Sequence, residues 1–218
     1  MRTDPATGRA FRGSQKWLQR FVEAAPAALA PEGLGPLDWV SPVAANRFSE
    51  YQDAAFLHAL GLGHLAPALP DFWPRGGAVW DGLAQSVQGP VLVEAKAHIQ
   101  ESFSSPCGAK APASRALIGA SLTACAQDLG ADPRSDWMRC HYQTANRIAH
   151  LWWLHRQGVT AHLLFVHFVG DTDMTGPASA ETWRAVEKAA AYALGLPTRH
   201  ALSCYIHHVH PDVALLAD

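Results

Sequence analysis

Residues 89–98 combine an apolar strand with three ionisable side chains on one face, and this combination limits the folds open to the chain. The segment reads Gly-Pro-Val-Leu-Val-Glu-Ala-Lys-Ala-His. Because successive side chains of a strand point to opposite faces, Glu94, Lys96 and His98 share one face. Burying an unpaired acid or ammonium costs free energy, so this face requires either ion-pair partners or a functional role. We expect the end of the strand to lie at an open cleft.

A second carboxylate lies in the preceding segment. Residues 78–84 and 90–99 are predicted to form a β-hairpin with a turn at residues 88–89. The hairpin would bring Asp81 beside Glu94. Two carboxylates and a backbone carbonyl are ligands of the kind that Mg²⁺ uses, and a nearby lysine can orient a metal-bound water. The pattern therefore favours a site for a divalent cation.

The rest of the chain alternates helices and strands. Ser41 followed by Pro42 is a typical helix start, and Gly61 a typical end, so a helix is predicted over residues 42–60. The hairpin is followed by further predicted elements: helices at 113–129 and 135–157, a strand at 159–169, a helix at 179–194 and a strand at 200–209. This order predicts an α/β fold with a central mixed sheet flanked by helices.

A chain of 218 residues has the length of one domain, with room for an appendage. Residues 1–40 are predicted to form an N-terminal arm, in which Ser14 caps a short helix and an Ala/Pro-rich linker follows. Residues 41–218 are predicted to form the single α/β domain.

Composition excludes several classes of protein. The net charge of −2 gives no general attraction to nucleic acid, so any such binding must be local. No run of about 18 apolar residues indicates a membrane span, and the polar residues 1–23 do not form a signal peptide, so we expect a cytoplasmic protein without membrane partners. The four cysteines contain no CxxC pair and are interpreted as reduced core residues.

The spacing of the acidic residues resembles the PD-(D/E)XK nuclease superfamily. The resemblance depends on Asp81 and, 13 positions later, on Glu94-Ala95-Lys96 at the end of an apolar strand. It covers residues 41–209. Trp80 replaces the proline that gives the superfamily its name. The resemblance implies a restriction-endonuclease-like core of the αβββαβ type.

It also implies a metal-dependent nuclease that hydrolyses the phosphodiester bonds of nucleic acid, with DNA as the favoured substrate. Asp81, Glu94 and the carbonyl of Ala95 would hold Mg²⁺ or Mn²⁺, and Lys96 would position the attacking water. The residues leave open DNA or RNA, internal or terminal cutting, and the oligomeric state.

Glu50 is a further candidate ligand. On the predicted helix over 42–60, Val43, Glu50 and Leu57 share one face, which places a carboxylate in an apolar stripe. It resembles the glutamate that the superfamily often places on its first core helix. The alternative is an acid at the edge of the stripe, paired with Arg47 or with solvent.

Three other residues are accessory candidates. Gln143 and Tyr142 on the predicted helix 135–157 resemble, at a different spacing, the Gln and Tyr that exonucleases of the superfamily place beside their site. His98 shares the face of Glu94. These residues could equally cap neighbouring strands or face water.

Three alternatives remain from the sequence. The chain could be a non-catalytic member of the same fold that binds nucleic acid or protein and keeps Asp81, Glu94 and Lys96 as a structural network. It could be a metal-independent enzyme that uses His98 as a base. Finally, Cys204, His208 and His210 lie on one face of a predicted strand and suggest a soft-metal site, although no second cluster completes four ligands.

Overall fold

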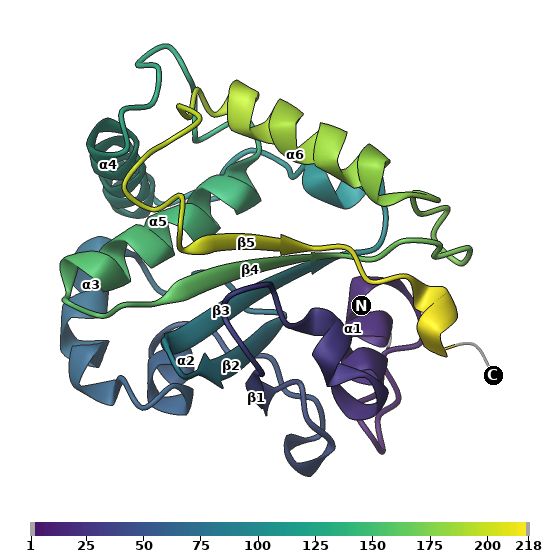
Figure 1. The fold of residues 1–218 in the computed structure, drawn as a ribbon. Coiled ribbons are helices and arrows are strands. Elements are labelled where there is room, and N and C mark those ends of the chain that lie inside the picture. The colour runs from purple at the N-terminus through teal and green to yellow at the C-terminus, as the bar shows by residue number, and fades with distance from the viewer. Residues whose placement is uncertain (1–2, 217–218) are drawn as a thin grey trace.

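A five-stranded mixed sheet forms the centre of the computed structural model, which describes residues 3–216 (Figure 1). The strands follow one another across the sheet in chain order: β1 (Asp38–Ser41), β2 (Gly82–Ser86), β3 (Gly89–Lys96), β4 (His162–His167) and β5 (Ile206–Val209). The first three strands are antiparallel, and β3, β4 and β5 are parallel. The predicted α/β fold with a mixed sheet flanked by helices is confirmed.

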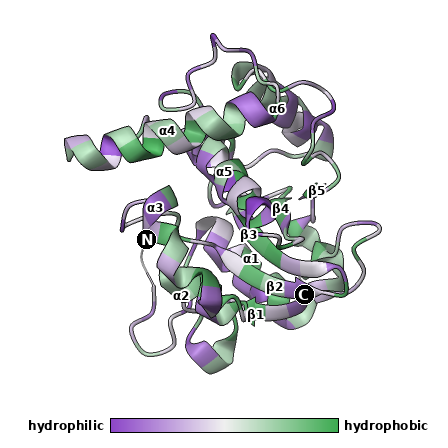
Figure 2. Ribbon diagram, turned by 90° about the vertical axis from the view of Figure 1, so that its left-hand side faces the viewer, coloured by the Kyte–Doolittle hydropathy of each residue, from purple (hydrophilic) through white to green (hydrophobic). Residues whose placement is uncertain are grey.

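Helices cover both faces of the sheet (Figure 1). The helices are α1 (Gly13–Ala24), α2 (Ala54–Ala59), α3 (Leu69–Phe72), α4 (Pro112–Asp128), α5 (Tyr142–Arg156) and α6 (Ala180–Ala193). Short 3₁₀ turns lie at Pro26–Leu29, Ala44–Asn46, Gly63–Ala68, Ile99–Ser102 and Val213–Leu216. In Figure 2 the α4 and α6 ribbons show both hydrophobic and hydrophilic colours, as expected of helices with one buried face.

Helix α1 packs against the face of the sheet opposite to α5. Leu18 and Phe21 are fully buried there, in a cluster with Val91 and Val93 of β3. The ring of Phe21 lies 5.4 Å from that of Phe168. The predicted N-terminal helix is therefore present, but Ser14 lies inside it rather than at its cap, because the helix begins at Gly13.

The predicted hairpin is confirmed, with residue 82 opposite residue 93. Only residues 87 and 88 separate the two strands. Gly89 follows with a φ of 138°, and a Cβ atom there would lie 2.0 Å from the carbonyl oxygen of Thr160. Glycine is therefore required where the hairpin passes the start of β4.

The helix predicted over residues 42–60 is wrong. Only its last part is helical, as α2, and Ser41 belongs to β1, where its hydroxyl donates to the carbonyl of Ser49 rather than capping a helix. Arg47, Phe48 and Asp53 have positive φ angles, which interrupt any continuous right-handed helix. Consequently Val43, Glu50 and Leu57 do not form a helical row.

Other boundaries differ from the prediction for local reasons. Helix α5 begins at Tyr142 rather than at residue 135, because the preceding residues form turns in which the carbonyl of Met138 accepts a hydrogen bond from the amide of Cys107 at 2.8 Å. All four cysteines are free, as predicted, but only Cys107 and Cys125 are buried; the expected core position is wrong for Cys140 and Cys204, which are exposed.

No helix among residues 3–216 is long and apolar enough to cross a membrane.

We predict that Phe21→Ala lowers the free energy of unfolding by about 3–5 kcal/mol, the usual cost of removing a buried phenylalanine side chain. Phe21 is fully buried between α1 and the sheet. Phe11→Ala is the matched control, since Phe11 is 56% exposed. Urea denaturation measures both changes, and equal small effects would show that α1 is not part of the folded core.

Candidate active site at the start of β2 and the end of β3

The two ionisable side chains of β3 are buried beneath α5. Glu94 and Lys96 point to the face of the sheet that α5 covers, and they form an ion pair with each other. Glu94 is 1% exposed and Lys96 is 8% exposed. The shared face predicted from strand alternation is therefore confirmed, but the expected open cleft is wrong for these two residues.

Arg147 of α5 is the second cationic partner of Glu94. Its Nε donates to Oε2 of Glu94 at 2.6 Å, and its two terminal nitrogens donate to the carbonyl of Val79 at 2.7 Å and to Oδ1 of Asn146 at 2.8 Å. The guanidinium also lies 4.8 Å from the ring centre of Trp80. A buried carboxylate is thus held by two cations, as its burial requires.

Asp81 lies immediately before β2 and faces the end of β3. Its Oδ2 accepts a hydrogen bond from the amide of Ala95 at 2.7 Å, and its Oδ1 accepts one from Nε2 of Gln15 at 3.0 Å. Because the N–H and C=O of one strand residue point to the same side, the carbonyl of Ala95 also faces Asp81. The predicted position of Asp81 beside Glu94 agrees with the pairing of residues 82 and 93.

Gln143 joins the site from the first turn of α5. Its Oε1 accepts a hydrogen bond from Nζ of Lys96 at 2.9 Å. Its backbone N–H donates a hydrogen bond to Oγ of Ser104 at 2.9 Å. The segment that follows β3 therefore helps to fix the start of α5 over Lys96.

Glu50 approaches the site from a loop rather than from the predicted helix. The residue is exposed, yet partial burial of its carboxyl and the negative charge of Glu94 raise its pKa. Arg47 does not pair with Glu50; its guanidinium donates to the carbonyl of Pro5.

Two accessory candidates point elsewhere. Nδ1 of His98 lies 3.0 Å from Oε1 of Gln100, and its Nε2 lies 3.8 Å from Glu101, so this imidazole faces the turn after β3. Tyr142 packs at the edge of the core near Cys107, and burial raises the pKa of its hydroxyl. The structure thus brings neither side chain to Glu94.

The electrostatics of the two central carboxyls differ. Burial and the charge of Glu94 raise the pKa of Asp81 to about 7, despite the favourable charges of Lys96 and Arg147. Burial alone would also raise the pKa of Glu94, but Arg147 and Lys96 outweigh it and lower that pKa. The carboxyls of Asp81, Glu94 and Glu50 therefore face only two cations among residues 3–216. Because both cations are directed at Glu94, Asp81 and Glu50 are the carboxyls left without a cationic partner in this part of the chain.

Sequence reasoning missed Arg147 and Gln15. Arg147 lies one turn after Gln143 on the polar face of α5, so its proximity to the site was open to inference from helical spacing. Gln15 gave no such signal, because it lies on α1, far from the motif in the sequence. Its Nε2 donates to both the carbonyl and the carboxylate of Asp81.

Comparisons with known proteins give no relative for this chain: no family model, no curated protein and no solved structure matches it.

We predict that Arg147→Met lowers the free energy of unfolding by about 3–5 kcal/mol, because it removes one member of a buried ion pair and leaves Glu94 undercompensated. Lys96→Met should cost less, since Arg147 keeps its three hydrogen bonds. The exposed Lys110→Met serves as the control. Equal effects of the Arg147 and Lys110 changes in chemical denaturation would contradict this account of the site.

We also predict a pH dependence from Asp81. Its pKa is about 7 in the folded protein and about 3.9 in the unfolded chain, so the folded state binds the extra proton. The resulting stability is complete below pH 4 and is lost as the pH rises to 7, with a slope of at most about 1.4 kcal/mol per pH unit. In metal-free buffer, denaturation curves of Asp81→Asn should lack this decline; an unchanged slope would contradict it.

Proposed function

We propose that the chain is a metal-dependent nuclease of the PD-(D/E)XK type that hydrolyses phosphodiester bonds. The observation that carries this proposal is the convergence of Asp81, Glu94 and Lys96 at the end of β3, with the amide of Ala95 bonded to Asp81. The excess negative charge of the site favours binding of a cation. The donor atoms that the site offers are mainly oxygens, which hard divalent cations prefer.

The order of elements supports this proposal. Helix α1, strands β1 to β3, helix α5 and strand β4 follow one another in the αβββαβ order that the resemblance implies. Helices α2 and α3 lie between β1 and β2, α4 lies between β3 and α5, and α6 and β5 follow β4. In this alignment the first core helix is α1, so Gln15, rather than Glu50, takes the position of the helical ligand.

The donor set fits a hard divalent cation such as Mg²⁺ or Mn²⁺. Asp81, Glu94, Glu50 and the carbonyl of Ala95 would hold it. Gln15 offers a further oxygen, because its Oε1 is buried and has no hydrogen-bond partner among residues 3–216. A cation bound there would neutralise phosphate charge and lower the pKa of a coordinated water.

The remaining polar residues of the site have positioning roles in this proposal. Lys96 presents an ammonium group next to the carboxylates, where it can orient water and stabilise charge on the phosphate. Gln143 holds that ammonium group at 2.9 Å. Arg147 holds Glu94, and through the carbonyl of Val79 it also anchors the chain just before Asp81.

Nucleic acid is the substrate class, with DNA as the first choice. The net charge of −2 provides no general attraction, so the cationic groups and the metal of the site must supply it locally.

A second candidate is a non-catalytic member of the fold. It is favoured by the burial of Glu94, whose two oxygens already receive hydrogen bonds from Lys96 and Arg147. In this case the network would stabilise the protein, and the chain would act by binding nucleic acid or another protein.

We predict that the full chain cleaves DNA with Mn²⁺ or Mg²⁺ and that Asp81→Asn reduces cleavage about a hundredfold or more, the upper range for loss of a partner that supports a metal. Asparagine keeps an oxygen acceptor for the amide of Ala95 but lacks the charge. Labelled single- and double-stranded DNA and RNA measure activity, and calorimetry with Mn²⁺ measures binding. Asp71→Asn, which changes an exposed aspartate, is the matched control.

Lys96→Met separates binding from turnover in the same experiment. It should retain Mn²⁺ affinity and lose cleavage. A wild-type protein that neither cleaves any of these substrates nor binds Mn²⁺ would contradict the nuclease and favour the structural network. Binding without cleavage would keep the metal site but exclude the proposed activity.

A further inference from the structure

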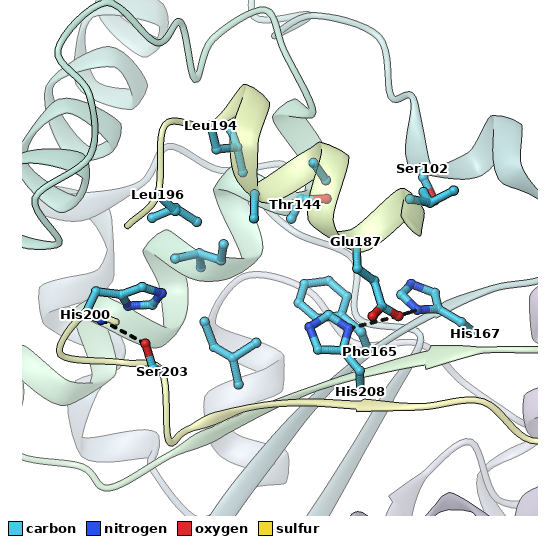
Figure 3. A pocket seen from close by; sticks show the side chains of 15 residues that line it. Ser102, Thr144, Phe165, His167, Glu187, Leu194, Leu196, His200, Ser203 and His208 are labelled. Atoms are coloured by element: carbon cyan, nitrogen blue, oxygen red, sulfur yellow. Dashed lines mark hydrogen bonds and ion pairs between the residues drawn. The ribbon is translucent and has the colours of Figure 1, made fainter. Parts of the chain in front are cut away.

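A cluster of three histidines surrounds Glu187 of α6, on the face of the sheet that α5 and α6 cover. Oε1 of Glu187 lies 2.6 Å from Nδ1 of His167, 2.7 Å from Nε2 of His210 and 3.3 Å from Nδ1 of His208. His167 ends β4, His208 belongs to β5 and His210 follows that strand. Figure 3 shows the carboxylate between the imidazoles of His167 and His208.

Hydrogen bonding alone accounts poorly for this arrangement. A carboxylate oxygen has about two lone-pair sites, whereas three imidazole nitrogens approach Oε1 of Glu187. The donor atoms of His167, Glu187 and His210 all lie within 4.8 Å of one another. A metal with bonds of about 2.0–2.1 Å fits among donors at such spacing after a small movement of the carboxylate.

Aromatic packing holds the histidines in place. The imidazole of His167 stacks on Trp183 at 4.6 Å, and the indole N–H of Trp183 donates to the carbonyl of Phe168 at 2.8 Å. The ring of Phe165 stacks on His208 at 5.1 Å. Rings fixed in this way lose little further conformational freedom on binding a metal, which favours affinity.

The cluster borders a cavity of about 280 Å³ between α5, α6 and the sheet. His167, Glu187 and His208 line one end of this cavity, and the other lining residues are mainly apolar, including Ile148 and Leu194 (Figure 3). A metal held by the cluster would thus be within reach of a small molecule in the cavity.

We propose that His167, Glu187 and His210 bind a divalent transition metal such as Zn²⁺, with His208 as the fourth ligand. Two or three imidazoles with one carboxylate form the donor set that Zn²⁺ and its neighbours prefer, whereas Mg²⁺ prefers oxygen. Cys204, which the sequence suggested as a ligand beside His208 and His210, is exposed and lies outside this group.

The site is separate from the carboxylates of β3. His167 lies beside Lys96 in the pairing of β4 with β3, but its ring is directed to Glu187 and Trp183 rather than to Glu94. Zinc binding here does not depend on the proposed nuclease function, and either site can fail without the other.

The experiment is calorimetry of the chelator-treated full chain with ZnCl₂, together with thermal denaturation at increasing Zn²⁺. The Cys140→Ser/Cys204→Ser protein provides the background, because exposed thiols also bind Zn²⁺. We expect one bound Zn²⁺, a rise in Tm with Zn²⁺, and a loss of at least about tenfold in affinity in both Glu187→Gln and His210→Gln. In Glu187→Gln the amide oxygen can still accept from the histidines, and in His210→Gln the amide nitrogen can still donate to Glu187, so the fold should persist.

His207→Gln and Asp81→Asn are the matched controls, and both should bind Zn²⁺ as the background does. His207 lies on the same strand but pairs with His162 at 3.0 Å, outside the cluster. The proposal is overturned if the cysteine-free protein does not bind Zn²⁺, if Glu187→Gln and His210→Gln bind it normally, or if only Asp81→Asn loses it.

Discussion

The buried carboxylate of Glu94 is the interaction on which the arrangement of this protein depends. An ionised group that is only 1% exposed is tolerable only with full compensation, and Glu94 receives it from Lys96 on its own strand and from Arg147 on α5. The same guanidinium also binds the carbonyl of Val79 in the segment before β2. One buried charge therefore links the hairpin to the helix that covers it, and through Val79 it anchors the chain just before Asp81.

That arrangement explains why the pKa of Asp81 is raised whereas the pKa of Glu94 is lowered. The two cations are directed at Glu94, so Asp81 keeps mainly the neutral donors of Ala95 and Gln15 and shows a raised pKa. A structural network would be expected to compensate all its buried charges. One carboxyl is left undercompensated here, beside a glutamine oxygen that has no hydrogen-bond partner among residues 3–216, and both features support the proposed cation site.

The sequence predicted the parts of the fold that local pattern determines. Alternation in residues 89–98 placed Glu94 and Lys96 on one face, and the short hairpin placed Asp81 near them. The prediction over residues 42–60 failed because capping signals at Ser41 were outweighed by positive φ angles and by pairing of Tyr51 with Trp80, neither of which a helical pattern reveals. The contacts of Gln15 depend on packing between distant segments, so no local pattern contains them, whereas the helical spacing from Gln143 could have indicated Arg147.

The two candidate metal sites differ in their donor atoms. Around Asp81 the donors are carboxylate, amide and carbonyl oxygens, which a hard cation prefers; around Glu187 they are mainly imidazole nitrogens, which a transition metal prefers. Their difference follows from adjacent strands of one sheet. Strand β3 ends in Glu94 and Lys96, whereas β4 ends in His167, and the helix above each strand supplies the complement: Arg147 from α5 and Glu187 from α6. Arg147 thus adds a second cation to the carboxylate of Glu94, whereas Glu187 adds a carboxylate to the imidazoles, and this sets the chemistry of each site.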